Sequence, residues 1–545
     1  MHVGKRTCRQ QSGGVMQEND MLFLGLDSST QSLKAIVMDQ GLKVVYTASV
    51  NFDTDLPEFG TEGGVHHGPD GLTVTSPTIM WVAALDLLLK KMAEDRFDFA
   101  KVAAVSGSGQ QHGSVYLKKG GIKALNGLTA GNSLRSQLEE CFSIPDSPIW
   151  MDSSTGQQCK MLESALGGAQ AVADLTGSRA YERFTGNQIA KMFQTKRQGY
   201  EDSERILLVS SFMASLLVGD YVPIDASDGS GMNLMDLRSK TWNRQAIDAT
   251  APGLEQKLGQ IVPSHSVAGP IHSYYRDLCG FTRDCLVICF SGDNPNSLAG
   301  LRLQRAGDIA ISLGTSDTMF GSLASPTPSA SEGHIFANPV DPNGYMAMVC
   351  QKNGSLTRER VRDEFAGGTW DAFDKALART PAGNNGNVGF YIDEPEITPP
   401  LLQTGVFRFD ASGTRLDSFA PDLDARAVVE SQFLSLLVHG SNIGLKPAGI
   451  LATGGASTNK SITTIMSNVF GVPVYAGEQP DSAALGACYR ALHGWQCNAA
   501  QAFVPFADTV KGAPKIQQVA TPNAAAHAAY SAMLDHYRAL EGSLV

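Results

Sequence analysis

One pattern occurs twice in this chain, near the start of each half, and it constrains the fold more than any other feature. Each copy contains a short apolar strand, a turn rich in Gly, Asp, Ser and Thr, and a second apolar strand, at residues 22–24, 25–30 and 33–38 and again at 309–311, 314–318 and 319–320. A repeated unit indicates two similar halves, and two such halves commonly enclose a cleft. The sequence therefore predicts a duplicated protein with a ligand site between its halves.

The rest of the chain alternates between predicted strands and helices, which indicates mixed α/β layers. One helix is expected to use Ser76 as its N-cap and to carry Pro77 in its first turn. The second copy of the repeated unit begins shortly after position 290, so we expect an N-terminal domain at 21–290 and a C-terminal domain at 291–545. Residues 1–20 are expected to form a disordered or flexible extension.

Charge and cysteine content exclude several kinds of partner. The chain has 545 residues and a formal net charge of −11, so its field repels nucleic-acid backbones and anionic lipid surfaces, and neither partner is expected. Its nine cysteines include no CxxC pair, and no apolar stretch reaches the ~18 residues of a membrane helix. These features indicate a reducing, cytoplasmic compartment. The oligomeric state stays open between monomer and dimer.

The two polar turns have the composition of a phosphate site. Backbone N–H groups and hydroxyls can converge on an anion where no bulky side chain intervenes, and Thr30, Gly314 and Thr315 lie in these turns. Asp27 would repel phosphate unless a divalent cation lay between them, so we expect Asp27 to hold Mg²⁺, directly or through water. Either turn alone fits an ordinary capped hairpin better, and it is their pairing that favours phosphate.

A third glycine cluster follows an apolar strand and precedes a predicted helix. Gly454 and Gly455 would let the backbone approach a nucleotide at the helix N-terminus, and Asn459 could reach a base or sugar edge. Glycines at such a place also permit plain tight packing of a strand–helix turn. Trp370 could stack on a base or sugar, although a lone tryptophan is more often part of a core. No GxxxxGK[ST] loop occurs, which excludes that type of phosphate site.

Polar residues after two other predicted strands suit sugar chemistry. Asp293 and Asn294 follow the apolar run 286–290 and open a predicted helix, where α/β folds carry catalytic groups. As a general base, Asp293 need only accept the proton of a hydroxyl that attacks phosphorus, and an ordinary N-cap is the alternative. Gln111, His112 and Arg183 offer the donors and acceptors that a polyhydroxy ligand requires, whereas His112 alone also fits a half-buried imidazole satisfied by backbone.

Together these motifs resemble the FGGY carbohydrate kinases. The resemblance covers residues 21 to about 495 in the family's order and rests on seven segments, at 25–31, 106–113, 150–154, 182–187, 292–295, 312–318 and 451–457. It implies an α/β fold of two actin-like, ribonuclease-H-like domains, with mixed sheets flanked by helices, that face each other across a cleft. The N-terminal domain would bind the sugar and the C-terminal domain ATP.

The resemblance also implies residue roles and an activity. It implies contacts to sugar by four residues and to ATP by three, namely His112, Arg183, Asp293 and Asn294, and Trp370, Gly455 and Asn459. Asp293 matches the catalytic base and Asp27 the position linked to metal and phosphates. The implied reaction moves the γ-phosphoryl group of MgATP to the C5 hydroxyl of D-xylulose. A sibling kinase of ribulose, glycerol or another polyol, and a sugar-binding sensor without transfer, are the alternatives.

Overall fold

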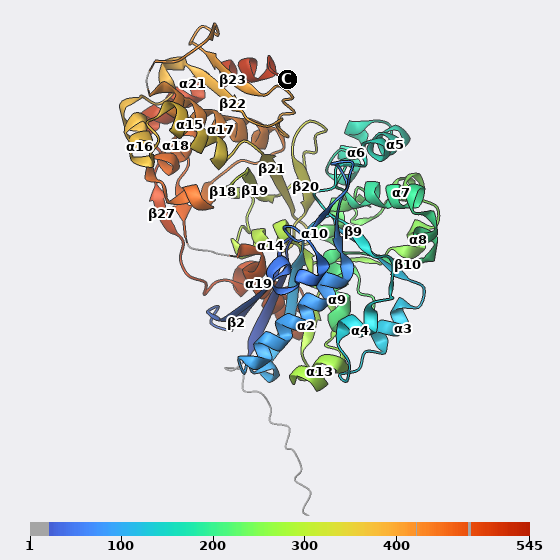
Figure 1. The fold of residues 1–545 in the computed structure, drawn as a ribbon. Helices are drawn as coiled ribbons and strands as arrows, with labels where there is room; N and C mark the ends of the chain where they lie inside the picture. Colours follow the sequence, from blue (N-terminus) through green and yellow to red (C-terminus); the bar gives the residue numbers. More distant parts are fainter. Residues whose placement is uncertain (1–20, 421, 478–480) are drawn as a thin grey trace, which may run out of the picture.

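The computed structural model describes residues 21–420, 422–477 and 481–545, and the predicted extension at 1–20 lies outside the described residues. Two seven-stranded sheets, flanked by helices, form the centres of the two halves seen in Figure 1. Among the described residues, none of the helices combines the length and apolarity that a bilayer crossing requires. The predicted α/β class is therefore confirmed.

Each large sheet gathers strands from distant parts of the chain. The first has the order β15-β16-β6-β1-β2-β3 with β17 beside β6, and its strands are β1 Leu22–Ser28, β2 Ser32–Asp39, β3 Val44–Asn51, β6 Val102–Gly109, β15 Val267–Pro270, β16 Leu286–Ile288 and β17 Ser291–Gly292. The second has the order β20-β21-β19-β18-β25-β26-β27, and its strands are β18 Asp308–Leu313, β19 Asp317–Leu323, β20 His334–Ala337, β21 Tyr345–Gln351, β25 Gly449–Thr453, β26 Val474–Ala476 and β27 Gln517–Ala520.

The two sheets share an arrangement of six strands each, while β17 in the first sheet and β20 in the second have no counterpart. In each, three strands form an antiparallel meander, β1-β2-β3 in the first sheet and β18-β19-β21 in the second. The first strand of each meander also pairs in parallel with a strand from much later in the chain, β6 or β25. A further parallel strand and an antiparallel edge strand complete the match, β16 with β15 and β26 with β27. The duplication predicted from the repeated turn is therefore confirmed.

The turns are shorter than the sequence pattern suggested. β1 continues through Ser28, because Asp27 pairs with Lys34 of β2, so Asp27 lies inside the strand instead of opening the turn. Only residues 29–31 remain between β1 and β2. In the second sheet the turn comprises 314–316, and Asp317 already begins β19. Both turns leave the sheet at the end of a strand that pairs in parallel with a neighbour.

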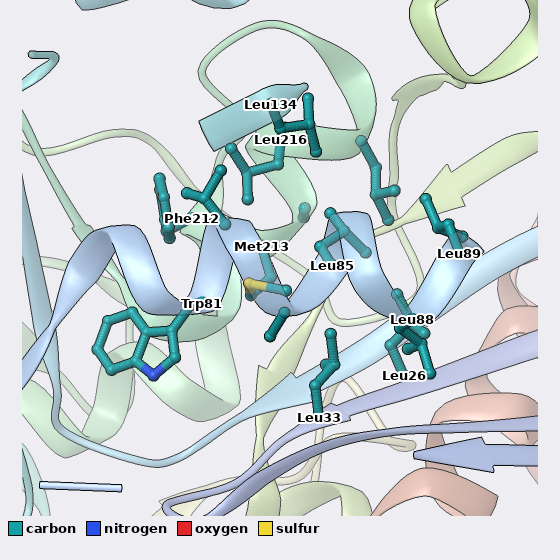
Figure 2. Packing of buried hydrophobic residues seen from close by; sticks show 14 of the residues in the cluster. Leu26, Leu33, Trp81, Leu85, Leu88, Leu89, Leu134, Phe212, Met213 and Leu216 are labelled. Atoms are coloured by element: carbon teal, nitrogen blue, oxygen red, sulfur yellow. The ribbon is translucent and has the colours of Figure 1, made fainter. Parts of the chain in front are cut away.

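One face of the first sheet is covered by α2 (Thr78–Glu94) and α9 (Val209–Val218). Leu26 and Leu33 of the sheet belong to one buried cluster with Trp81, Leu85 and Phe212 of these helices (Figure 2). The prediction that Ser76 caps α2 is wrong. The helix begins one residue later than expected, so Pro77 occupies the N-cap position and no side chain caps the helix. The Ser76 hydroxyl instead donates to Gly64 O in the preceding loop, at 2.8 Å.

Two helices, α14 (Asp293–Gly300) and α19 (Ser482–Ala500), lie between the sheets at the centre of Figure 1. Successive strand residues face opposite sides, so Phe23 of β1 and Ala310 of β18 enter one buried cluster with these helices. The two helices approach so closely that a Cβ added at Gly486 would lie 1.8 Å from Asn296 O. Because α19 comes from the predicted C-terminal domain but packs on the first sheet, the boundary near 290 stays a prediction.

The remaining larger helices cover the outer faces of the two halves. Their bounds are α5 Gly156–Leu166, α6 Ala169–Thr176, α7 Thr185–Thr195, α15 Ser355–Phe365, α16 Trp370–Arg379, α17 Leu423–Asn442, α18 Lys460–Phe470 and α21 Ala524–Gly542. Ile309 and Ile311 of β18 pack with α17 and α18 in a second buried cluster, on the face opposite Ala310. Each half therefore has a core around its own sheet, a further cluster under α5 and α7 lies in the first half, and a shared cluster joins the two sheets.

Candidate active site

Three neighbouring parallel strands of the first sheet end at one edge. The register places Ser28 of β1 beside Gly109 of β6, and Gly109 beside Gly292 of β17. Asp27 precedes this row by one residue and Asp293 follows it by one. The ends of parallel strands are where α/β proteins bind ligands, so the fold brings the two predicted carboxylates to one functional edge.

Asp27 is a buried carboxylate near the end of β1, and it accepts a hydrogen bond from a neighbouring strand. Ser108 Oγ, which lies opposite it on β6, donates to Asp27 Oδ1 at 2.6 Å. Burial raises the pKa of Asp27, while Ser108 and the nearby Lys34 lower it to a smaller extent. Among the residues that the structure describes, no group of three or more His, Cys, Asp and Glu side chains could hold a metal alone. This donor set fits a cation held jointly by protein and phosphate oxygens, as Mg²⁺ commonly is.

Asp293 is the first residue of α14, and Gly292 occupies the N-cap position. The carboxylate of Asp293 accepts hydrogen bonds from the backbone N–H of Asn294 at 2.8 Å and from Asn294 Nδ2 at 3.1 Å. Burial, with repulsion from Asp27 as a second cause, raises the pKa of Asp293 to about 7. A carboxylate with a pKa near neutrality is well matched to accepting a proton at physiological pH.

Gln111 and Asn294 are joined by a hydrogen bond, although 183 positions separate them, since Asn294 Nδ2 donates to Gln111 Oε1 at 2.9 Å.

The buried carboxyl group of Asp228 lies close to Gln111 and Gly292, and the sequence analysis missed it. Ser210 Oγ donates to its carboxyl group at 2.5 Å, and burial raises the pKa of Asp228 to about 8. Gly292 leaves room for this arrangement, because an added Cβ would lie 2.3 Å from Gln111 Cγ. The run of Asp, Ser and Gly at 225–231 was the signal that could have found it.

His112 has a defined tautomer. A backbone carbonyl only accepts, so the bond of 2.9 Å between His112 Nδ1 and Gly231 O places the ring proton on Nδ1 and leaves Nε2 as an acceptor. Burial, followed by the charge of Arg183, lowers the pKa of His112 to about 3, so the ring is neutral. The imidazole stacks on Phe184 with ring centres 4.4 Å apart. A fixed neutral acceptor of this kind suits a sugar hydroxyl.

Residues predicted to contact ATP meet at a cavity of about 800 Å³ in the second half. Gly314 and Thr315 reach it from the turn after β18, Trp370 from the start of α16, and Gly455 and Asn459 from the segment before α18. Asn459 also caps α18 by accepting from Ile462 N at 2.9 Å. Three segments far apart in the sequence therefore form one hollow of a size suited to a small ligand.

Two other predicted residues lie outside this cavity. Gly454, with a φ of 80°, borders an adjacent hollow of about 840 Å³, and an added Cβ there would lie 2.5 Å from Leu313 O. Thr30 lines a separate cavity of about 470 Å³ in the first half and accepts from Trp150 Nε1 at 2.9 Å. The structure thus places Gly454 beside the cavity that Trp370 and Asn459 line, and Thr30 apart from it.

The repeated topology, with polar side chains at strand ends of both sheets, is the arrangement expected for two actin-like units. Residues 143–300 match the N-terminal domain of the FGGY family of carbohydrate kinases, and residues 309–495 match the C-terminal domain. The chain belongs to the FGGY family of carbohydrate kinases, as its motifs indicated.

Relatives and solved structures agree with this assignment. A xylulose kinase from Mus musculus is 55% identical and covers 95% of this chain and 93% of its own length, and xylulose kinase 2 from Arabidopsis thaliana is 52% identical and covers 90% of each. A xyloylose kinase from Brucella ovis, 21% identical, aligns with a TM-score of 0.79 over 96% of this chain and 99% of its own. A Plasmodium falciparum glycerol kinase with ADP, 14% identical, gives 0.76 over 96% and 98%. These structures confirm the fold class of two actin-like units.

Proposed function

We propose that this chain transfers the γ-phosphoryl group of ATP to the C5 hydroxyl of D-xylulose and releases D-xylulose 5-phosphate. The observation that carries the proposal is the carboxylate of Asp293, which has a pKa near 7 and lies at the strand edge beside Asp27. The choice of sugar is supported by relatives above 50% identity whose names state that they are xylulose kinases.

In this mechanism Asp293 accepts the proton of the C5 hydroxyl as its oxygen attacks the γ-phosphorus in line with the leaving oxygen of ADP. Asn294 fixes the carboxylate through two hydrogen bonds, and Gln111 fixes Asn294. His112 Nε2 and the guanidinium of Arg183 supply an acceptor and donors for the other hydroxyls. The attacking C5 oxygen is thus held in one orientation toward the phosphorus. Because this order is established on binding, less entropy is lost on reaching the transition state, and the barrier is lower.

The nucleotide is assigned to the cavity beside Trp370. Trp370, whose ring also carries the Arg362 guanidinium, offers an aromatic side chain, and Gly314, Thr315 and Gly455 offer backbone and hydroxyl donors. Asp27 would hold a divalent cation, proposed as Mg²⁺, whose positive charge would offset negative charge on the phosphates in the transition state. Partners beyond the sugar and ATP are not proposed, and cysteine usage supports a cytoplasmic location.

A substrate panel tests the proposal. The purified chain is mixed with MgATP and D-xylulose, D-ribulose or glycerol, and ADP release is followed by a coupled assay. We expect kcat/KM to be highest for D-xylulose. A preference for ribulose or glycerol would favour a sibling kinase, and calorimetric sugar binding without ADP release would favour a sensor that has lost transfer. The glycerol kinase likeness does not support the glycerol alternative, because identity of 14% shows the fold alone.

A further inference from the structure

The edge strand β20 of the second sheet is bonded to the first half of the chain. Ile335 N donates to Gly177 O at 3.0 Å, and Ser227 Oγ donates to Ala337 O at 2.6 Å. On its other side β20 pairs with β21 within the second sheet. β20 therefore pairs with a strand of the second half on one side and is hydrogen-bonded to the first half through Gly177 and Ser227.

His334, the first residue of β20, contacts the proposed sugar site directly. Its Nε2 atom lies 2.6 Å from Arg183 Nη2, and its Nδ1 atom lies 3.1 Å from Ser178 Oγ. A guanidinium has only donors, so His334 Nε2 must accept, and the ring proton resides on Nδ1 and is donated to Ser178. The hydrogen-bond pattern fixes the tautomer without reference to pH.

The surroundings keep this imidazole neutral. Burial, followed by the charges of Arg183 and His112, holds the pKa of His334 well below its usual value. Arg183 also lies over the Tyr181 ring, with 5.2 Å between the guanidinium carbon and the ring centre. The Arg183 guanidinium is thus held between a neutral acceptor and an aromatic face. These contacts fix the plane of the guanidinium and leave its other N–H donors for a ligand.

We infer that His334 is a positioning residue of the sugar site, which orients the Arg183 guanidinium by accepting its Nη2–H. The inference rests on the proposed function, in which Arg183 binds the sugar. It adds that the sugar site is completed by a side chain from the second sheet, although the sugar residues themselves lie in the first half. Any displacement of β20 relative to the first half would move Arg183 and alter sugar affinity.

The test measures D-xylulose binding by calorimetry, together with steady-state kinetics. His334→Leu has similar bulk but no acceptor, and we expect it to raise the sugar Kd and KM by about tenfold or more, since a charge-assisted hydrogen bond is lost. The KM for ATP and the kcat should stay within about twofold. His334→Gln retains an acceptor and should bind sugar within about threefold of the unmodified chain. His265→Leu, a histidine that contacts His493 and Phe503, controls for loss of an imidazole and should change neither constant.

A double-mutant cycle separates this inference from the proposed function. Arg183→Ala should weaken sugar binding, and adding His334→Leu to it should weaken binding no further, because His334 acts through Arg183. If Arg183→Ala leaves sugar binding unchanged, the proposed site is wrong. If Arg183→Ala weakens binding but His334→Leu does not, or if the two effects add in full, the inference about His334 is wrong. A His334→Gln variant that binds as weakly as the leucine variant also overturns it.

Discussion

Arg358 and Asp317 form a two-point ion pair in which neither side chain is exposed to solvent. Nη1 and Oδ2 are 2.5 Å apart, and Nη2 and Oδ1 are 3.0 Å apart. Asp317 begins β19 immediately after the turn 314–316, and Arg358 lies on α15, where it also donates to Ser355 Oγ at 2.9 Å. This ion pair therefore holds in place the turn 314–316, which borders the cavity proposed to bind the nucleotide.

Asp317→Asn should destabilise the protein and weaken ATP binding together. The substitution leaves the Arg358 cation buried without a counter-charge, for which about 3–5 kcal/mol of unfolding free energy is expected. Denaturant unfolding and ATP calorimetry measure the two effects. Asp371→Asn, in an exposed pair with Lys375, is the matched control and should cost less than about 1 kcal/mol. Equal losses in the two variants would show that the buried pair does not anchor the turn.

Asp293→Ala should abolish catalysis without abolishing sugar binding. Loss of the general base is expected to lower kcat by at least ~10², while the D-xylulose Kd stays within about tenfold. Single-turnover measurements and calorimetry check the two parts. Asp220→Ala, an exposed aspartate far from the strand edge in sequence, serves as the control. Unchanged turnover in the alanine variant would remove Asp293 from the role of base.

The pH profile should show one acidic limb with a midpoint near 7. Only ionised Asp293 accepts a proton, and its pKa is about 7, so kcat/KM should fall tenfold per pH unit well below that value. Linkage gives the sign for stability. Between pH 3.8, the ordinary pKa of an aspartate, and about pH 7, the native state keeps the Asp293 proton and the unfolded state loses it. The unfolding free energy therefore decreases as pH rises through that range. Asp293→Asn should show a smaller decrease than the unmodified chain, because Asp228, whose pKa is also raised, still contributes. Thermal unfolding of both chains at several pH values measures the difference.

Trp370→Ala should raise the KM for ATP and leave the KM for D-xylulose unchanged. Trp370 borders the nucleotide cavity and has 36% of its surface exposed. Loss of a stacking face is expected to weaken ATP binding by about tenfold. Phe365→Ala is the control, because this side chain is 38% exposed but packs under Arg408 outside the cavity. A shift in the sugar KM of the tryptophan variant would contradict the placement of ATP.

Gly486→Ala should destabilise the core between the two sheets. The new Cβ would lie 1.8 Å from Asn296 O, a backbone atom, so α19 and α14 would have to separate. Overpacking of this kind costs about 1–3 kcal/mol or more. Gly542→Ala, where an added Cβ meets nothing within 4 Å, controls for the change of residue type. Equal melting temperatures for the two variants would show that the helices tolerate the displacement.

The location of several candidate site residues was predictable, because they lie at strand ends that the sequence marks by residue type. Gly314, Thr315, Trp370, Gly455 and Asn459 border one cavity as expected. Asp27 and Asp293 meet because parallel strands end at a common edge, a consequence of topology that a single pattern of apolar residues cannot give.

Partners distant in sequence were not predictable. His334 contacts Arg183 across 151 positions, and nothing in the local run 332–337 distinguishes an acceptor from an ordinary strand residue. Asp228 was missed because a buried carboxyl looks like a turn residue when its neighbours are Ser and Gly. The domain boundary is difficult to predict for the same reason. The contacts of α19 lie with β1 and β6 of the first sheet, although its place in the sequence suggests the second half.

The placement of α19 sets a condition on biosynthesis. Helix residues 482–500 are made long after β1 and β6, the strands that they cover. One face of the early sheet must therefore stay uncovered until this distant helix has been translated. Nascent chains of this enzyme would depend on chaperones during that interval, and fragments ending before position 482 would expose the apolar face permanently and aggregate.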